Sequence, residues 1–145
     1  MIRTARFEDL GSLRAIDELA VYQREGRAWV ATDEDDRPVG YILARVVDSN
    51  AHIDQVSVHP NHARQGIGAD LIETVVAWAK QHRLAAITLT TFSEVPWNAP
   101  YYQRLGFKRV ADVEVTDGLR RIRDHEAAHG LAEWPRVTMR RPLTG

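Results

Sequence analysis

The sequence predicts an α/β domain built around one mixed sheet. Strand-like and helix-like segments interleave along the whole length, which is typical of a sheet with helices packed against it. The 145 residues are 44% hydrophobic and 27% charged, an ordinary globular balance, and no repeat, linker or low-complexity tract divides them. A single domain covering residues 1–145 is therefore expected.

The first half of the chain is predicted to contain a strand, a helix and a hairpin. Residues 2–6 alternate weakly, as a strand does. Within 7–20, apolar residues recur every three positions, which indicates an amphipathic helix. Two β-branched runs, at 28–31 and 39–47, flank the acidic stretch 33–38 and predict a hairpin. The acidic turn is interpreted as a solvated loop rather than a cation site.

The second half alternates strands with helices. Strands are expected at 52–58, 84–92, 107–115 and 135–142. Helices are expected at 71–82, 98–105 and 119–129, the first from the spacing of its apolar residues. Gly106 and Gly130 follow the other two, where a glycine commonly ends a helix.

Composition excludes several classes of function. Lys plus Arg number 19 against 20 for Asp plus Glu, so the net charge of −1 gives no basic excess for binding nucleic acid. No cysteine is present, which excludes disulfides, thiolate metal sites and a cysteine nucleophile. No run of about 18 apolar residues and no signal-peptide core appear. Neither nucleic acid nor a membrane is an expected partner, and the cytoplasm is the expected compartment.

A glycine segment lies between the strand at 52–58 and the long helix. The first amides of a helix lack internal partners, and glycines let the backbone approach a phosphate oxygen closely. The sequence lacks both the Walker pattern and the third glycine of the dinucleotide fingerprint. The alternative is a helix start whose glycines serve tight packing. The residues expected to contact a phosphate are Ala63, Arg64, Gln65, Gly66, Ile67, Gly68 and Ala69.

Two motifs resemble those of one superfamily. Val58-His59-Pro60, followed by Gly66-Ile67-Gly68, resembles motif A of the GNAT superfamily of N-acetyltransferases. Tyr102-Gln103-Arg104-Leu105-Gly106-Phe107 is similar to the family's Tyr-x-x-Leu-Gly-Phe. The resemblance covers about three-quarters of the chain. It implies a GNAT-like mixed, mostly antiparallel central sheet of about seven strands, with helices on both faces.

The sequence departs from the family pattern at three places. Ala63 stands where the family usually has Arg or Gln, and Arg64 next to it is the candidate replacement for that charge. The segment 21–27 is short where many members have a second helix, and an extra helix is expected near 119–130. The last two departures fall on the acceptor side of the expected fold.

The resemblance implies an acetyl-CoA-dependent N-acetyltransferase that moves the acetyl group to a primary amine in a ternary complex. The backbone of Val56 and Val58 would then pair with the pantetheine arm, and Tyr102 would protonate the leaving thiolate. Asn98 would cap its helix or contact the pantetheine, and Glu94 and Trp97 would line the acceptor pocket. The acceptor would be a small-molecule or peptide amine, and the oligomeric state stays open, with a homodimer as one alternative.

A primary amine needs a base, because its pKa of about 10.4 leaves it protonated at neutral pH. His52 and Asp54 are the candidates, and the two-residue period of a strand predicts that both share one face with Val56 and Val58. Each also has a plain interpretation as a surface strand residue.

Two other functions compete. His125-Glu126-Ala127-Ala128-His129 matches the His-Glu-x-x-His pattern of zinc peptidases, but a catalytic zinc needs a third protein ligand and the sequence offers no further histidine after it. No metal is therefore expected. The second alternative is a non-catalytic module that binds or senses acyl-CoA, which the presence of Tyr102 disfavours.

Overall fold

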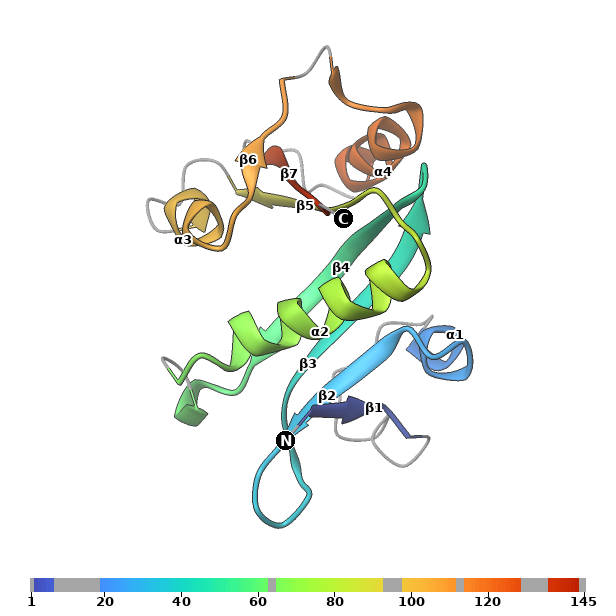
Figure 1. The fold of residues 1–145 in the computed structure, drawn as a ribbon. Helices are drawn as coiled ribbons and strands as arrows, with labels where there is room; N and C mark the ends of the chain where they lie inside the picture. Colours follow the sequence, from blue (N-terminus) through green and yellow to red (C-terminus); the bar gives the residue numbers. More distant parts are fainter. Residues whose placement is uncertain are drawn as a thin grey trace.

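A computed structural model describes residues 2–6, 19–62, 65–92, 98–111, 114–128 and 136–143 (Figure 1). Seven strands form one sheet in the order β1-β2-β3-β4-β5-β7-β6. Its strands are β1 (Ile2–Thr4), β2 (Ala28–Thr32), β3 (Pro38–Val47), β4 (Asn50–Val58), β5 (Ala86–Phe92), β6 (Lys108–Arg109) and β7 (Arg136–Pro142). The pair β4–β5 is parallel and the other five pairs are antiparallel. The predicted fold class is confirmed.

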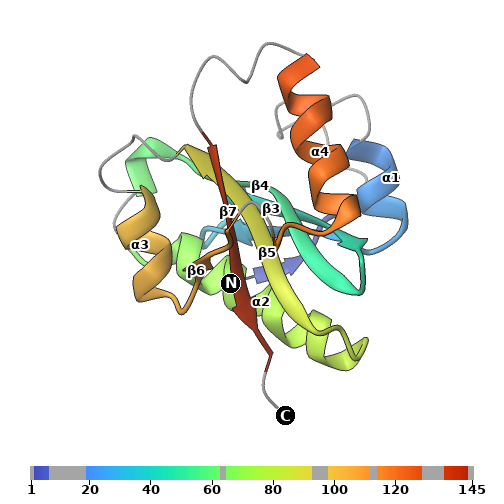
Figure 2. The same ribbon diagram turned by 90° about the horizontal axis from the view of Figure 1, so that it is seen from above.

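Helices cover both faces of the sheet. They are α1 (Leu19–Arg24), α2 (Ile67–Gln81), α3 (Asn98–Arg104) and α4 (Asp117–Ala128), with a short 3₁₀ turn η2 (Pro60–His62) before α2. The long helix α2 crosses one face, whereas α1 and α4 lie on the opposite face (Figures 1 and 2). The two faces are called the α2 face and the α1 face below.

Each face has its own apolar core. On the α2 face, the buried side of α2 packs on Ile42, Ile53 and Ile87 of the central strands. That side of α2 consists of Leu71, Ile72, Val75, Val76 and Ala79. On the α1 face, a smaller cluster joins Tyr22 of α1 to Val30. Two apolar faces on one sheet require two covering layers, which the helices supply.

Helix α3 ends where the sequence predicts. Gly106 has a φ of 94°, a left-handed conformation that favours glycine. The Gly106 amide donates to the Gln103 carbonyl and the Phe107 amide donates to the Tyr102 carbonyl, both at 3.0 Å. This pair of bonds is the Schellman arrangement, which uses otherwise unpaired carbonyls at a helix end.

Two elements differ from the prediction. Within the expected strand at 107–115, the described residues form only the short strand β6, Lys108–Arg109, and the Glu114 amide donates to the Ala111 carbonyl at 2.8 Å. Helix α1 spans Leu19–Arg24, although the predicted helix ends at 20. Most of that predicted helix, residues 7–18, lies outside the described residues. The segment 21–27, expected as a connection, therefore holds most of α1. Among the described residues, no helix has both the length and the apolar character needed to cross a membrane.

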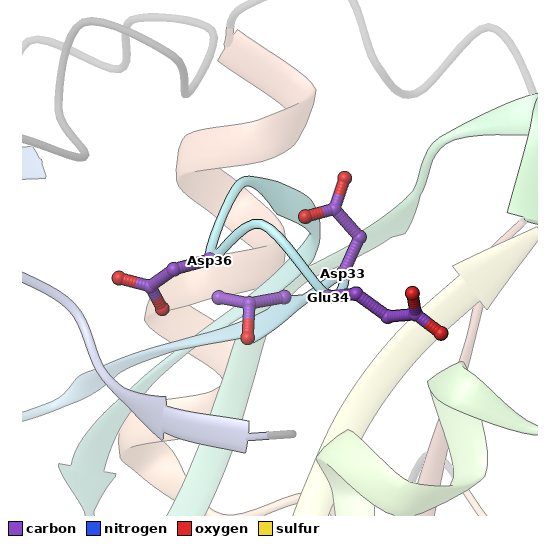
Figure 3. A pocket seen from close by; sticks show the side chains of 4 residues that line it. Asp33, Glu34 and Asp36 are labelled. Atoms are coloured by element: carbon purple, nitrogen blue, oxygen red, sulfur yellow. The ribbon is translucent and has the colours of Figure 1, made fainter.

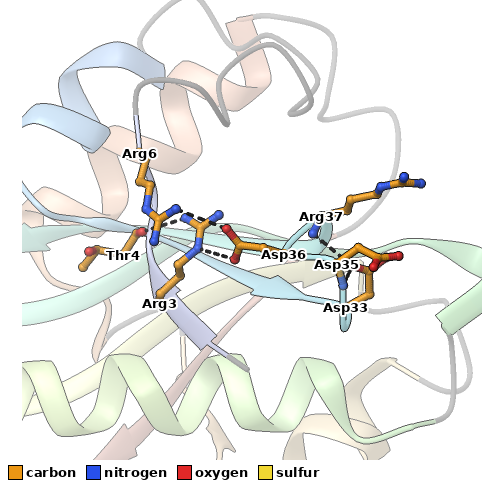
Figure 4. Close-up of polar contacts among 7 residues, drawn as sticks. All are labelled: Arg3, Thr4, Arg6, Asp33, Asp35, Asp36 and Arg37. Atoms are coloured by element: carbon orange, nitrogen blue, oxygen red, sulfur yellow. Dashed lines mark hydrogen bonds and ion pairs between the residues drawn. The ribbon is translucent and has the colours of Figure 1, made fainter.

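The acidic turn between β2 and β3 is held by its own carboxylates. Asp33 Oδ1 accepts from the amides of Asp35 and Arg37, each at 2.9 Å, and Asp36 binds Arg3 and Arg6 at 3.1 Å (Figure 4). The hydrogen bond from the Arg37 amide is the main reason that the pKa of Asp33 lies below its usual range. In Figure 3 the carboxylates of Asp33, Glu34 and Asp36 point away from one another around an open cavity of about 440 Å³. They do not converge on a common point.

The turn between β3 and β4 anchors α4. Asp48 Oδ2 accepts from the Gly118 amide at 2.8 Å, in the first turn of α4. The backbone of Gly118 lies close to the Asp48 carboxylate: a Cβ added to Gly118 would lie 2.5 Å from the same oxygen. A hydrogen bond from the Thr116 side chain is the largest effect that lowers the pKa of Asp48, and the bond from the Gly118 amide adds a smaller one. An anion at a helix N-terminus also interacts favourably with the helix dipole.

We expect Asp48→Asn to lower the thermal midpoint at pH 7. Because the folded pKa is depressed, the stabilisation exists above the ordinary value of 3.8 and is lost as the pH falls through the folded pKa. Thermal melts of parent and variant should therefore converge in acid. Asp35→Asn, an equal change of charge at the exposed β2–β3 turn, is the control. A constant difference at all pH values would contradict the anchoring role.

Candidate active site

The parallel strands β4 and β5 part near their starts. Only Ala51 and His52 of β4 pair with β5, opposite Ile87 and Thr88. On its other side β4 continues to pair with β3 as far as Val58. In the part of the chain that the structure describes, no β5 residue therefore pairs with β4 beyond His52. The backbone of β4 at 53–58 is available on that edge, as the expected contact of Val56 and Val58 with a pantetheine arm requires.

The N-terminus of α2 lies beyond the end of β4. Gly66 stands at the N-cap with a φ of 77°, and no side-chain bond caps the first turn. The first helical bond runs from the Asp70 amide to the Gly66 carbonyl at 3.0 Å. The amides of Ile67, Gly68 and Ala69 precede that bond, so they have no partner within the helix. Together with the helix dipole they form a site suited to a phosphate.

Gly68 brings three elements together. A Cβ built on Gly68 would lie 3.1 Å from the Tyr101 hydroxyl of α3 and 3.9 Å from Cγ2 of Val58. The end of β4, the start of α2 and the side chain of Tyr101 thus meet at this glycine. Gln65 is exposed beside it. The expected phosphate-binding residues that are described therefore lie next to the expected pantetheine-binding strand.

Tyr102 lies on the same helix, half-buried against the core of the α2 face. Its ring meets Phe107 edge-on at 5.9 Å and Tyr101 at 5.2 Å. Burial, with a smaller effect of Tyr101, raises the pKa of Tyr102. Its phenol therefore remains protonated at neutral pH, as a proton donor must.

A β-bulge in β4 changes which residues share a face. Leu43 pairs with Gln55 but Ala44 pairs with Ile53, so Asp54 is the extra residue. Ile53 and Val56 both pack on the α2 face, whereas Asp54 contacts Tyr22 on the α1 face. The prediction that His52 and Asp54 share a face with Val56 and Val58 is wrong. The inserted residue shifts the two-residue period by one.

Asp54, one of the two candidate bases, is hydrogen-bonded through both carboxylate oxygens. Its Oδ2 accepts from the Tyr22 hydroxyl at 2.6 Å and its Oδ1 accepts from Arg45 Nε at 2.9 Å. The side chain is 14% exposed. Burial raises the pKa of Asp54, while the bond from Tyr22 and the charge of Arg45 oppose that shift.

His52, the other candidate base, lies deeper. It is 2% exposed, and its Nδ1 lies 2.9 Å from Oγ1 of Thr88 on β5. His52 therefore ties β4 to β5 at the last residue pair before the strands part. Asp54 is more accessible to an incoming amine.

Several expected site residues fall outside the described residues: Ala63, Arg64, Glu94 and Trp97. Asn98 begins α3, and only its backbone is described. The side chains of the His125-Glu126-Ala127-Ala128-His129 motif are likewise outside the described part of the chain. Among the described residues, no group of three or more His, Asp or Glu side chains is arranged to hold a metal.

Tyr22 and Arg45 are not identified as candidate site residues by the sequence alone. A signal for the bulge exists, because the apolar positions Ala51 and Ile53 are out of phase with Val56 and Val58. That shift places one extra residue between the two pairs. No local pattern identifies Tyr22, which reaches Asp54 from 32 positions away in the sequence.

A seven-stranded sheet whose central parallel pair parts beside a helix N-terminus defines the class of fold. The Acetyltransferase (GNAT) family matches residues 3–107. The chain belongs to this family, and its class is therefore that of the acetyltransferases.

A relative of known function agrees with that assignment. The chain is 29% identical over 93 residues to the peptidyl-lysine N-acetyltransferase YjaB of Escherichia coli (strain K12), a match covering 64% of this chain and 57% of that protein. It thus spans less than two thirds of the length of this curated relative.

Two solved structures share the fold. The ribosomal-protein-S18-alanine N-acetyltransferase of Escherichia coli has a TM-score of 0.71 at 17% identity, covering 100% of this chain and 94% of that one. The N-acetylglutamate synthase of Neisseria gonorrhoeae, complexed with coenzyme A and N-acetyl-glutamate, has a TM-score of 0.77 at 15% identity, covering 100% of this chain and 35% of that one.

Proposed function

We propose that the chain is an acetyl-CoA-dependent N-acetyltransferase that transfers the acetyl group directly to a primary amine in a ternary complex. The observation that carries the proposal is the parting of β4 from β5 beside the uncapped N-terminus of α2. Family membership supports the same reaction. The relatives named for a peptidyl lysine and for an alanine of ribosomal protein S18 favour a peptide amine as the acceptor, with a small amine as the alternative.

The described residues fit acetyl-CoA. A helix start at Gly66 without a side-chain cap suits a pyrophosphate, and a glycine at 68 leaves space where a Cβ would approach the Tyr101 hydroxyl. The edge of β4 at Val56 and Val58, with which no described residue of β5 pairs, suits the amide groups of a pantetheine arm. When bound, acetyl-CoA supplies a reactive thioester.

Two side chains are assigned to proton transfer. Tyr102 holds a proton on its phenolic oxygen and can give it to the departing thiolate. Asp54 accepts a proton from the acceptor's ammonium group, directly or through a water. His52 is the less favoured base, because it is 2% exposed and lies against Thr88.

Acceptor-dependent thiol release separates this proposal from a non-catalytic acyl-CoA-binding module. We would incubate the protein with acetyl-CoA and four amines in turn: a lysine-containing peptide, a peptide with a free N-terminal alanine, spermidine and an aminoglycoside. An enzyme releases coenzyme A faster with at least one amine than without any. Binding of acetyl-CoA with no release above background for any amine would support the binding module instead.

We expect Gly68→Val to raise the KM for acetyl-CoA about tenfold or more, about 1.4 kcal/mol. The new side chain would occupy space beside the first amides of α2. The Tyr101 hydroxyl, 3.1 Å from the added Cβ, is the end of a flexible side chain and can move, so the variant should fold. Gly68→Ala should give a smaller rise. A folded Gly68→Val protein with unchanged KM would overturn the phosphate-site assignment.

A further inference from the structure

The carboxylate at the β4 bulge is held from three separate elements. Tyr22 reaches Asp54 from α1, Arg45 reaches it from β3, and the bulge itself belongs to β4. The two donors bind different oxygens, so rotation of the carboxylate would break both bonds. Each carboxylate oxygen can accept more than one hydrogen bond, and Asp54 therefore keeps capacity for a further donor.

Tyr22 is itself held in place. Its side chain is 7% exposed in the apolar cluster of the α1 face. The Arg27 guanidinium lies 4.9 Å from the centre of its ring. Arg27 in turn donates to the Ala44 carbonyl at 2.8 Å and forms an ion pair with Glu25. Ala44 is the β3 residue at which the bulge shifts the register, so Arg27 links Tyr22 to the bulge.

Burial raises the pKa of Asp54, and the groups around it limit that rise. The hydrogen bond from Tyr22 and the charges of Arg45 and Arg27 all favour the ionised carboxylate. Burial and the bond to Asp54 raise the pKa of Tyr22 well above its usual value. The hydroxyl is therefore protonated over the whole working range of pH, and it remains a donor to Asp54.

We propose that Tyr22 is a positioning residue for acetyl transfer: with Arg45, its hydroxyl fixes the orientation of the Asp54 carboxylate at the bulge and keeps it ionised to receive the acceptor's proton. The inference rests on the proposed function, because it assigns a support to the base of that same site. In the step concerned, one N–H bond of the acceptor's ammonium group breaks and one O–H bond forms on Asp54. The neutral amine that results is the nucleophile.

The first test follows Asp54 without any turnover. The carboxyl ¹³C resonance of Asp54, assigned by its loss in Asp54→Asn, is titrated in the parent and in Tyr22→Phe. Losing a hydrogen bond to a charged group should raise the pKa of Asp54 by about one unit or more. Tyr41→Phe is the matched control, since Tyr41 is also a buried residue of the α1 face cluster but its hydroxyl accepts from Gln55 at 2.6 Å. It should leave the Asp54 titration unchanged.

The second test uses the rate. In Tyr22→Phe, the acid limb of the pH profile of kcat/KM should move to higher pH by as much as the pKa of Asp54 rises in the ¹³C titration. The kcat of the variant should recover at higher pH. If Tyr22→Phe folds poorly, Arg45→Gln replaces it, because Arg45 is 42% exposed and tolerates substitution more easily. The Arg45 variant should shift the Asp54 titration in the same direction.

The outcomes separate this inference from the proposed function. A lower thermal midpoint in Tyr22→Phe with an unmoved Asp54 titration and acid limb would overturn the positioning role and leave a purely structural one. A parent protein that acetylates none of the four amines would overturn the proposed function, and the catalytic role of Tyr22 with it. The ¹³C titration would still show whether Tyr22 controls the ionisation of Asp54.

Discussion

Tyr102→Phe should lower kcat by about 10²–10⁴-fold, equivalent to about 3–5 kcal/mol in the activation free energy. The substitution keeps the ring and its edge-on packing against Phe107, and removes only the hydroxyl. The KM for acetyl-CoA and the thermal midpoint should change little. An interaction made mainly in the transition state behaves in this way. Steady-state kinetics with the best amine of the panel and a thermal melt measure the three quantities.

Tyr101→Phe is the matched comparison, one residue away on the same helix. Its hydroxyl lies beside Gly68 at the start of α2, so its removal should affect the KM for acetyl-CoA more than kcat. If Tyr101→Phe lowers kcat and Tyr102→Phe does not, the proton donor is Tyr101. If both variants keep full kcat, neither tyrosine protonates the thiolate, and water becomes the candidate.

The sequence predicts the sheet, the long helix and the end of α3 because each depends on local patterns. Apolar spacing within α2 and the glycine after α3 are readable from a few consecutive residues. The same local reasoning fails at β6. The length of β6 depends on its pairing with β7, which is a tertiary contact. The sequence of the expected strand at 107–115 does not reveal that partner.

The site residues also divide into those that local sequence patterns predict and those that depend on tertiary contacts. The glycines at 66 and 68 are identified by their order between strand and helix, and the structure places Gly68 beside Val58. The face of Asp54 is predicted wrongly, because a constant two-residue period assumes a strand without a bulge. The contacts of Tyr22 and Arg45 with Asp54 form only when folding brings α1 and β3 next to β4. Contacts of this kind have no local signature.

Asp54→Asn is expected to have a comparably large effect, lowering kcat/KM at pH 7 by about 10²–10⁴-fold through loss of the base. The side chain keeps its size, and its amide oxygen can still accept from Arg45. Arg45 is 42% exposed, so water can solvate any charge that the substitution leaves unpaired. The variant should therefore fold, which a thermal melt would establish before the kinetics.

The pH profile gives the sharper measurement. In the parent, kcat/KM should fall as acid protonates Asp54, at a pH above the ordinary aspartate value because burial raises the pKa of this carboxyl. In Asp54→Asn that limb should disappear. The remaining rate should climb tenfold per pH unit toward the pKa of the amine, about 10.4, since only amine that is already neutral can react. If Asp54→Asn keeps the parent profile while His52→Gln loses the acid limb, His52 is the base and Asp54 serves the bulge alone.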